Sequence, residues 1–183
     1  MGGKNPTIVT KHADLNKAAM GVMRSAFGFS GQKCSACSRV YVERDVYDPF
    51  MEKLVAKTKE LVIGDGLNKE TFVGPVIDEA AVKRFKEAVA AAKKDGGTVR
   101  TGGEHLTDGE YAKGTYVEPT VVDGIPLDHD LFKRELFLPF VAVAPVDSLE
   151  QALEEANDTE YGLTAGVFTE DEGEIQQFFD DIV

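Results

Sequence analysis

The chain has 183 residues, 43% of them hydrophobic, and a formal net charge of −12 at pH 7. This length and composition suit one domain with a sizeable core and exclude a disordered chain. So acidic a chain is a poor ligand for nucleic acid or anionic lipid, because both need clustered Lys and Arg. The longest apolar run, residues 137–146, is too short to span a bilayer, and the N-terminus lacks the apolar core of a signal peptide, so we expect a cytoplasmic protein.

Strand-like runs alternate with amphipathic helical windows along the chain, which is typical of an α/β protein. The first half predicts strands at residues 7–10 and 39–43 and helices at residues 14–27, 47–61 and 78–94. Asp14 is expected to cap the first helix, and Glu43 and Asp45 are expected to be loop charges.

The second half continues the same alternation. It predicts strands at residues 98–101, 116–122, 141–146 and 163–168, and helices at residues 148–157 and from 172 to the end. Ser148 is expected to cap the first of these helices, and residues 102–114 form the longest expected loop. No linker or repeat divides the chain, so residues 1–183 are expected to form a single domain.

Cys34 lies in a Gly/Ser-rich connection between a predicted helix and a predicted strand. A free thiol is only about 3% thiolate at neutral pH, and Lys33 beside it and the N–H groups of a glycine-rich turn would favour the charged form. A thiolate in such a turn can act as a nucleophile, whereas most free cysteines are packed in a core. The residues alone leave both interpretations open.

Cys34 and Cys37 have the spacing of thiol redox motifs and of half a zinc site. A zinc site needs two more ligands, and the three histidines stand at no ligand spacing from one another, so we expect no metal. A thioredoxin-like motif follows a strand and opens a helix, whereas this one follows a helix and precedes a strand. Packing is the favoured role of Cys37, and a thiol redox protein is a rival hypothesis.

Glu135 precedes an apolar strand, and on the residues alone it is an ordinary solvated carboxylate paired with Arg134. No Gly-x-Gly-x-x-Gly follows a predicted strand, and no Walker-type loop is present. These residues alone predict no site for a dinucleotide phosphate.

Six motifs, in order, make the chain resemble the catalytic domain of the NAD(P)-dependent aldehyde dehydrogenases. They are Gly2-Gly3-Lys4-Asn5-Pro6; Gly31-Gln32-Lys33-Cys34, with Ser38-Arg39 following; Val73-Gly74-Pro75-Val76-Ile77; Tyr116-Val117-Glu118-Pro119-Thr120; Glu135-Leu136-Phe137; and Ala156-Asn157-x-Thr159-x-Tyr161-Gly162-Leu163. Any one of them is weak, and six in the family's order are strong. The resemblance implies an open, mostly parallel sheet with helices on both faces, truncated at both ends.

The stretch around the thiol, residues 29–36, is most similar to the 1-pyrroline-5-carboxylate (glutamate semialdehyde) dehydrogenases of proline and arginine breakdown. Their substrate is a zwitterionic amino acid that bears an aldehyde, so polar groups near the thiol must meet its carboxylate. Lys33 and Ser35 are the candidates, through a charge-assisted hydrogen bond and a hydroxyl. A solvated surface lysine is an equal alternative for Lys33.

The resemblance implies covalent catalysis by Cys34. The thiolate adds to the aldehyde, the oxyanion is held partly by the Cys34 N–H, hydride passes to the nicotinamide, and water hydrolyses the thioester. Glu135 would hold the nicotinamide ribose and Phe137 would pack near the nicotinamide ring. Asn157 and Tyr161 match a motif that we interpret as structural.

Two departures from the family pattern limit this expectation. Leu138 stands where the family has glycine, and Met1 stands at the Leu that follows the general-base Glu of the family, whose NAD-binding domain lies further upstream. We therefore expect an incomplete catalytic domain that binds neither NAD nor NADP and has at most vestigial activity, within a full-length homo-oligomeric enzyme. A dehydrogenase of another aldehyde class and a non-enzymatic α/β interaction domain are the alternatives.

Overall fold

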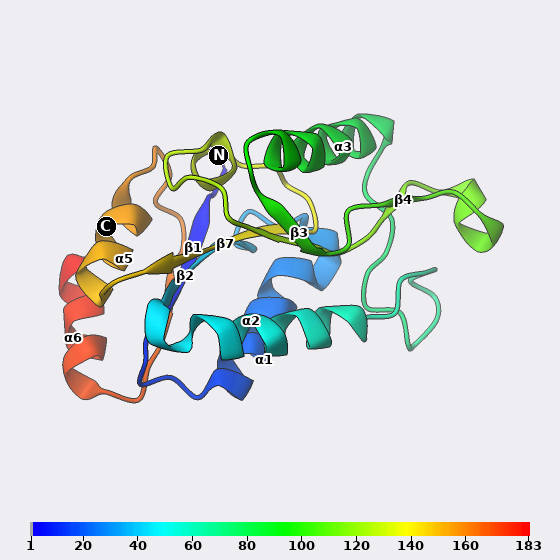
Figure 1. The fold of residues 1–183 in the computed structure, drawn as a ribbon. Coiled ribbons are helices and arrows are strands. Elements are labelled where there is room, and N and C mark those ends of the chain that lie inside the picture. The colour runs from blue at the N-terminus through cyan, green and yellow to red at the C-terminus, as the bar shows by residue number, and fades with distance from the viewer. Residues whose placement is uncertain (1) are drawn as a thin grey trace.

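A six-stranded sheet forms the centre of the computed structural model, which describes residues 2–183 (Figure 1). Met1, the residue at the Leu position of the first motif, lies outside the described residues. Only the edge strand β3 is antiparallel to its neighbour, so the predicted open, mostly parallel sheet is confirmed. The strand order is β3 (Thr98–Thr101), β6 (Thr120–Asp123), β7 (Phe140–Val146), β2 (Cys37–Glu43), β1 (Asn5–Val9) and β8 (Gly166–Phe168).

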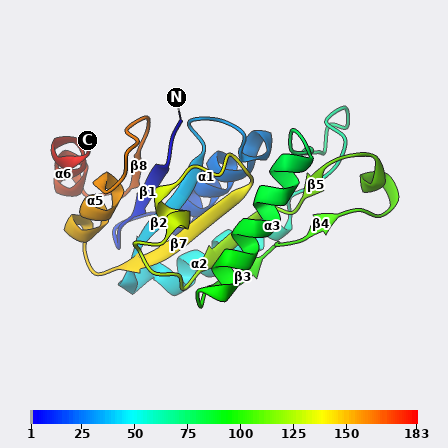
Figure 2. The ribbon, with the colours of Figure 1, turned by 90° about the horizontal axis from the view of Figure 1, so that it is seen from above.

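Helices cover both faces of the sheet, as predicted, because successive strand residues point to opposite sides. In β1, Val9 packs in the apolar cluster with α1 and α2, whereas Ile8 packs in the cluster with α3 and α5. Figure 1 shows α3 on one side of the sheet and α1 and α2 on the other, and Figure 2 shows the strands side by side from β3 to β8. The helices are α1 (Leu15–Phe27), α2 (Arg44–Lys59), α3 (Glu79–Lys94), α5 (Leu149–Asn157) and α6 (Glu172–Asp181), which packs beside α5.

The predicted helix caps are confirmed. The Asp14 carboxylate accepts hydrogen bonds from the N–H groups of Asn16 and Lys17 at the start of α1. Ser148 accepts from the Gln151 N–H at the start of α5. Each cap occupies an N–H group that the first turn of a helix leaves without a partner.

The prediction of one strand at residues 116–122 was wrong, because the chain breaks at Pro119. Proline has no N–H to donate to a ladder. The first part, β5 (Tyr116–Val117), pairs with β4 (His105–Leu106) in a separate two-stranded sheet, and only β6 joins the central sheet. The expected loop at residues 102–114 therefore contains β4 and a 3₁₀ turn, η2 (Gly109–Lys113).

The structure differs from prediction at further points. Glu43 is no loop charge, since it is buried and accepts a hydrogen bond from the Lys11 N–H at 2.7 Å, and Asp45 lies in the first turn of α2. The last strand begins only at Gly166, which leaves residues 160–165 as an irregular segment. A short helix, α4 (Asp130–Lys133), precedes Glu135 and was not predicted. No helix in the described part of the chain is long and apolar enough to cross a membrane.

Candidate active site

The thiol turn, residues 33–36, follows an unusual backbone segment. After α1 ends, Phe29, Ser30 and Gly31 all have φ between 55° and 67°, the left-handed region that non-glycine residues rarely adopt. The turn itself is closed by a hydrogen bond from the Ala36 N–H to the Lys33 carbonyl at 3.0 Å. Cys34 sits at its corner with an exposed thiol. This placement agrees with the nucleophile interpretation and excludes a packed role for Cys34.

Neighbouring segments hold the left-handed backbone in place. Gly31 lies against the Leu138 carbonyl, where a β-carbon would stand 2.1 Å from the oxygen. The Ser30 hydroxyl donates to the Gly74 carbonyl at 2.9 Å, and the Gln32 side-chain oxygen accepts from the Ile77 N–H at 2.8 Å. Strained backbone persists only where its surroundings over-determine it, and it tends to gather at functional sites.

Asn5 holds the other side of the thiol turn. Its Nδ2 donates to the carbonyls of Cys34 at 2.7 Å and Ala36 at 2.8 Å. Its Oδ1 accepts from the Thr164 N–H at 3.3 Å. The side chain is buried, and it connects the start of β1 to two segments that are far away in the sequence.

All five residues that the sequence singled out line one open cleft of about 1210 Å³. The structure thus brings together the thiol turn and the segment after α4, which are about 100 residues apart. A third wall comes from the irregular segment before β8. The lining residues are Gly2, Gln32, Lys33, Cys34, Ser35, Glu135, Phe137, Glu160, Tyr161, Gly162 and Leu163.

Glu135 is held by the N-terminal segment and not by Arg134. The Gly3 N–H donates to Glu135 Oε1 at 3.0 Å, while Arg134 pairs with Asp130. A β-carbon at Gly2 would stand 2.8 Å from Glu135 Oε2, so glycine there keeps that oxygen open to the cleft. A carboxylate oxygen positioned in this way can accept a hydrogen bond from a sugar hydroxyl. The expected pairing of Glu135 with Arg134 was wrong.

Phe137 has φ of 60° and a side chain that is 40% exposed. Such a backbone is costly for an aromatic residue, and it turns the chain so that Leu138 enters the core, where it is 4% exposed. Leu138 stands where the motif in the sequence analysis has glycine. Its larger side chain is thus accommodated inside the protein. The ring of Phe137 stays at the cleft, where it can pack against a flat ligand.

Lys33 and Ser35 flank the thiol but point to different surroundings. The Lys33 ammonium lies beside Gly28, where a β-carbon would stand 3.6 Å from Nζ, close to the C-terminal end of α1. The negative end of a helix attracts a cation. Ser35 is exposed and lines both the cleft and a second hollow that reaches Cys37. Both side chains are therefore available at the rim of the cleft.

Cys37 is packed, as predicted. It is 3% exposed, and burial raises the pKa of its thiol to about 11. The Thr7 hydroxyl donates to its sulfur at 3.2 Å. A thiol that is both buried and so weakly acidic cannot supply the reactive thiolate of a redox pair.

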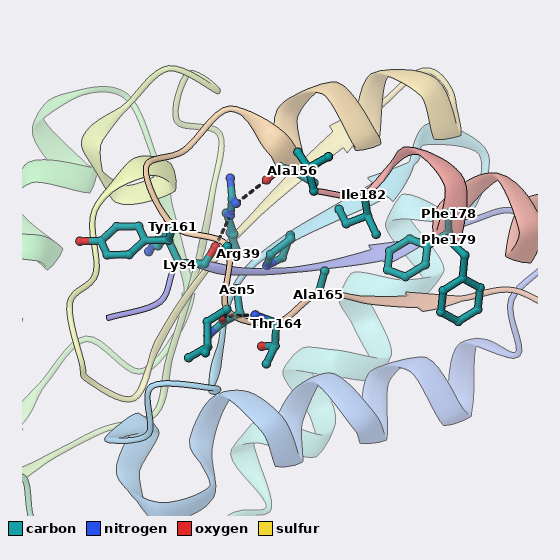
Figure 3. A pocket seen from close by; sticks show the side chains of 14 residues that line it. Lys4, Asn5, Arg39, Ala156, Tyr161, Thr164, Ala165, Phe178, Phe179 and Ile182 are labelled. Atoms are coloured by element: carbon teal, nitrogen blue, oxygen red, sulfur yellow. Dashed lines mark hydrogen bonds between the residues drawn. The ribbon is translucent and has the colours of Figure 1, made fainter. Parts of the chain in front are cut away.

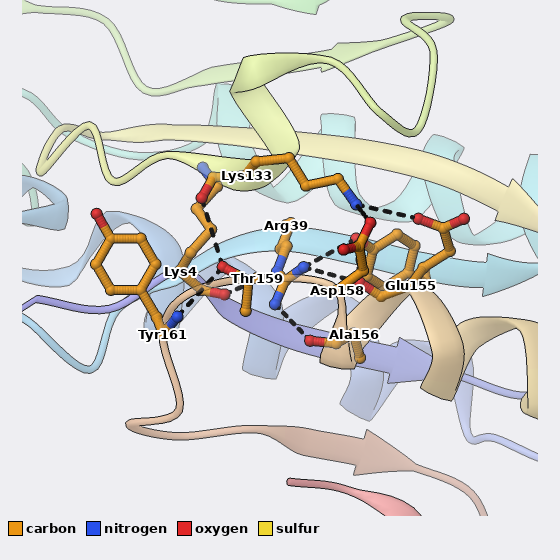
Figure 4. Close-up of polar contacts among 9 residues, drawn as sticks. Lys4, Arg39, Lys133, Glu155, Ala156, Asp158, Thr159 and Tyr161 are labelled. Atoms are coloured by element: carbon orange, nitrogen blue, oxygen red, sulfur yellow. Dashed lines mark hydrogen bonds and ion pairs between the residues drawn. The ribbon is translucent and has the colours of Figure 1, made fainter.

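Lys4 and Arg39 belong to the family motifs, but nothing in the sequence predicted that both side chains are buried. Arg39 donates to the backbone carbonyls of Lys4 at 2.7 Å, Glu155 at 2.9 Å and Ala156 at 2.6 Å (Figure 4). Lys4 is 1% exposed, and its Nζ has no hydrogen-bond partner among residues 2–183. Burial, followed by repulsion from Arg39, lowers the pKa of Lys4 to about 7. Of the two, only Arg39 connects segments, since it joins β2 to the backbone before β1 and to the end of α5.

Tyr161, expected to be structural, is part of the cleft. Its ring lies close to Gly2, since a β-carbon there would stand 3.0 Å from the ring. Tyr161 also lines a pocket between β1 and α6, together with Lys4, Asn5 and Phe178 (Figure 3). Asn157 has the expected structural role, because its side chain bonds the backbone of Asp181 and Val183. No group of three or more potential metal ligands occurs within residues 2–183.

Comparison with known proteins gives consistent matches. The whole chain, residues 1–183, matches the aldehyde dehydrogenase family. The alpha-ketoglutaric semialdehyde dehydrogenase of Bacillus subtilis is 41% identical over 182 residues, which cover 100% of this chain and 37% of that protein. The 1-pyrroline-5-carboxylate dehydrogenase of Bacillus cytotoxicus is 43% identical over 181 residues, covering 99% of this chain and 34% of that protein.

Solved structures agree with this match. The crystal structure of betaine aldehyde dehydrogenase from Staphylococcus aureus in complex with NAD+ is 31% identical and has a TM-score of 0.96. The match covers 100% of this chain and 36% of that chain. The present chain therefore spans about a third of the length of the curated relatives it matches.

Proposed function

Because this chain belongs to the aldehyde dehydrogenase family, we propose that it is the thiol-bearing part of an enzyme that oxidises an aldehyde to a carboxylic acid with NAD(P). The observation that carries the proposal is the exposed Cys34 thiol at the corner of a tightly held turn, facing the same cleft as Glu135 and Phe137. The strained backbone before the turn, and the buried amide of Asn5 behind it, support the same role.

The reaction begins at Cys34. Its thiolate adds to the aldehyde carbon and forms a carbon–sulfur bond, while the carbonyl oxygen becomes an oxyanion. The Cys34 N–H has no hydrogen-bond partner within residues 2–183 and is free to donate to that oxyanion. Loss of hydride from the same carbon leaves a thioester on Cys34. Water then breaks the carbon–sulfur bond, which releases the acid and restores the thiol.

NAD(P), when bound, supplies the two-electron acceptor for this oxidation. Two features of the chain fit its nicotinamide end. The open Oε2 of Glu135 can accept from a ribose hydroxyl, and the half-exposed ring of Phe137 offers a flat apolar surface. Glycine at position 2 is part of this fit, because a β-carbon there would crowd Glu135 Oε2. The chain's own contribution is to hold the ribose and shield the thiol from one side.

As the substrate we propose glutamate 5-semialdehyde, the open form of 1-pyrroline-5-carboxylate. Support comes from the 43% identity to a 1-pyrroline-5-carboxylate dehydrogenase and from the polar groups of Lys33 and Ser35 at the rim of the cleft. The alternative substrate is alpha-ketoglutaric semialdehyde, because the relative that is 41% identical is an alpha-ketoglutaric semialdehyde dehydrogenase. Both aldehydes carry a carboxylate that Lys33 could meet in a charge-assisted hydrogen bond.

We further propose that residues 1–183 are one incomplete catalytic domain of a longer cytoplasmic homo-oligomer. The relatives that the chain matches are about three times as long. On this proposal the NAD-binding domain lies elsewhere in the full-length enzyme, and the 183-residue chain alone binds no NAD(P) and reduces none.

The test is a steady-state assay of the full-length enzyme that contains this sequence, with glutamate semialdehyde, alpha-ketoglutaric semialdehyde and the uncharged propionaldehyde as substrates. We expect NAD(P)H formation that Cys34→Ala abolishes and that the control Cys37→Ala largely keeps. Lys33→Gln should raise KM for the two carboxylate-bearing aldehydes and leave that for propionaldehyde unchanged. Turnover that survives Cys34→Ala would disprove the mechanism.

A further inference from the structure

We infer that Asn5 is a positioning residue for Cys34, because its buried side-chain amide fixes the thiol turn and ties that turn to the opposite wall of the cleft. This inference rests on the proposed function, since it concerns how the attacking sulfur is presented. Asn5 touches neither the cleft nor the sulfur directly, so it acts through the backbone of Cys34.

The contacts of Asn5 leave its amide one orientation. Two carbonyl oxygens, those of Cys34 and Ala36, lie 2.7 Å and 2.8 Å from Nδ2 and need donors. The Thr164 N–H lies 3.3 Å from Oδ1 and needs an acceptor. An amide has two donor hydrogens on nitrogen and an acceptor oxygen, so it meets all three needs, and no other side chain of this size does.

The backbone of β1 aims Asn5 at the turn. Asn5 pairs with Cys37 in the neighbouring strand, but Pro6 pairs with Arg39, so Ser38 is skipped in a bulge. A bulge re-aims the side chains around it and is frequent beside active sites. Gly3 completes the close approach, because a β-carbon there would stand 2.3 Å from the Cys34 carbonyl oxygen.

With both carbonyls held, the peptide planes after Cys34 cannot rotate. The Ala36 N–H bond to the Lys33 carbonyl then closes the turn from its other side. The direction of the Cys34 side chain follows from these fixed planes. The third contact, to Thr164, joins this turn to the residue that follows Leu163 in the opposite wall.

Native alkylation by iodoacetamide tests this role in the 183-residue chain itself. The rate of Cys34 modification is measured over a pH series for the wild type, Asn5→Ala and Asn5→Asp. Asn157→Asp is the matched control, because Asn157 also donates to a carbonyl at 2.8 Å and accepts from an N–H at 3.1 Å, but far from the thiol. Protection of the buried Cys37 from alkylation reports that each variant is folded.

We expect both Asn5 variants to slow Cys34 modification throughout the pH series, by about threefold to tenfold at pH 7, because a turn that is no longer fixed presents the thiol in other directions. Asn5→Asp is isosteric and keeps the proposal testable if Asn5→Ala does not fold. The Asn157 control should keep the wild-type rate of Cys34 modification.

An unchanged rate of Cys34 modification in a folded Asn5 variant, or an equal decrease in the Asn157 control, would overturn the inference. A purely structural role would lower the melting temperature without changing the rate at which Cys34 reacts in the folded protein. A different result would contradict the proposed function. If wild-type Cys34 reacts no faster than N-acetylcysteine, the nucleophile assignment fails, while the variants still decide the role of Asn5 by comparison with the wild-type rate.

Discussion

Gly31 and Leu138 are in backbone contact: a β-carbon at Gly31 would stand 2.1 Å from the Leu138 carbonyl oxygen and 2.5 Å from its carbon. Through this contact the segment that carries Glu135 and Phe137 packs directly on the backbone that presents Cys34. The thiol turn and the segment with Glu135 and Phe137 are therefore fixed relative to each other before any ligand binds. Gly31 also has φ of 67°, so two independent reasons require glycine there.

Replacing Gly31 by alanine should therefore destabilise the protein strongly. Gly109→Ala is the matched control, since Gly109 has φ of 59° but a β-carbon added there would meet no other atom within 4 Å. We expect a loss of about 1 kcal/mol for Gly109→Ala from backbone strain and at least about 3 kcal/mol for Gly31→Ala from strain plus overlap. Urea denaturation measures both. Equal losses would mean that Leu138 moves aside without cost.

Alkylation of the two cysteines should differ sharply in the native protein. Cys34 is exposed, whereas Cys37 is buried and burial raises the pKa of its thiol to about 11. We expect iodoacetamide to modify Cys34 alone at neutral pH, and Cys37 only after denaturation, since the thiolate is the reacting form. Peptide mapping by mass spectrometry identifies the modified residue. Native modification of Cys37 would show that the strand opens far more often than its burial indicates.

Replacing Lys4 by methionine should stabilise the fold. Lys4 is fully buried, and within residues 2–183 its Nζ has no partner, so its ammonium form carries a desolvation cost that an apolar chain of similar shape avoids. We expect Lys4→Met to raise the free energy of unfolding by about 2–4 kcal/mol at pH 6. Lys17→Met, at a position where 73% of the side chain is exposed, is the control and should change little. Urea denaturation of both variants provides the measurement.

The gain in the free energy of unfolding from Lys4→Met should depend on pH. Its direction follows from the number of protons bound by the folded and the unfolded chain. Below about pH 7, Lys4 is protonated in both the folded and the unfolded chain, and the cost of burying its charge is complete. Between about pH 7 and 10.5 the unfolded chain holds a proton that the folded chain lacks, so wild-type stability from this group rises with pH. The advantage of methionine should therefore shrink across this window. An advantage that stays constant up to pH 10 would contradict the lowered pKa.

Replacing Arg39 by methionine should have the opposite effect. Its guanidinium donates to the carbonyls of Lys4, Glu155 and Ala156, and without it the Glu155 carbonyl would keep only the Tyr41 hydroxyl as a side-chain donor. We expect a loss of about 3–5 kcal/mol in the free energy of unfolding. The control Arg44→Met removes an exposed ion pair with Asp147 and should cost no more than about 0.5 kcal/mol. Thermal and urea denaturation would distinguish the two variants.

The sequence predicted those parts of the fold that depend on local signals. Asp14 and Ser148 mark helix starts because a short polar side chain meets free N–H groups there, and the alternation of Ile8 and Val9 follows from a sheet buried on both faces. Cys34, Glu135 and Phe137 were found through motif order, and the structure places all three on one cleft.

What the sequence could not predict depends on distant contacts. Phe29 and Phe137 have left-handed backbones that no local preference favours, and only packing from other segments holds them. Lys4 resembles an ordinary surface lysine in the sequence, yet it directly precedes β1, whose five residues are all buried, and its own side chain is buried with them. The division of residues 116–122 could have been predicted from Pro119 alone, since that residue cannot donate in a central strand.

The cleft is assembled from segments that lie far apart in the sequence, because β1 lies between β2 and β8 in the sheet. Asn5 and Thr164, joined by a hydrogen bond, are 159 residues apart in sequence, and Gly3 and Glu135 are 132 residues apart. Contacts of such long range form late in folding, because the chain between them must be brought together first. The cleft beside Cys34 is therefore completed only when β1 has paired with both of its neighbours.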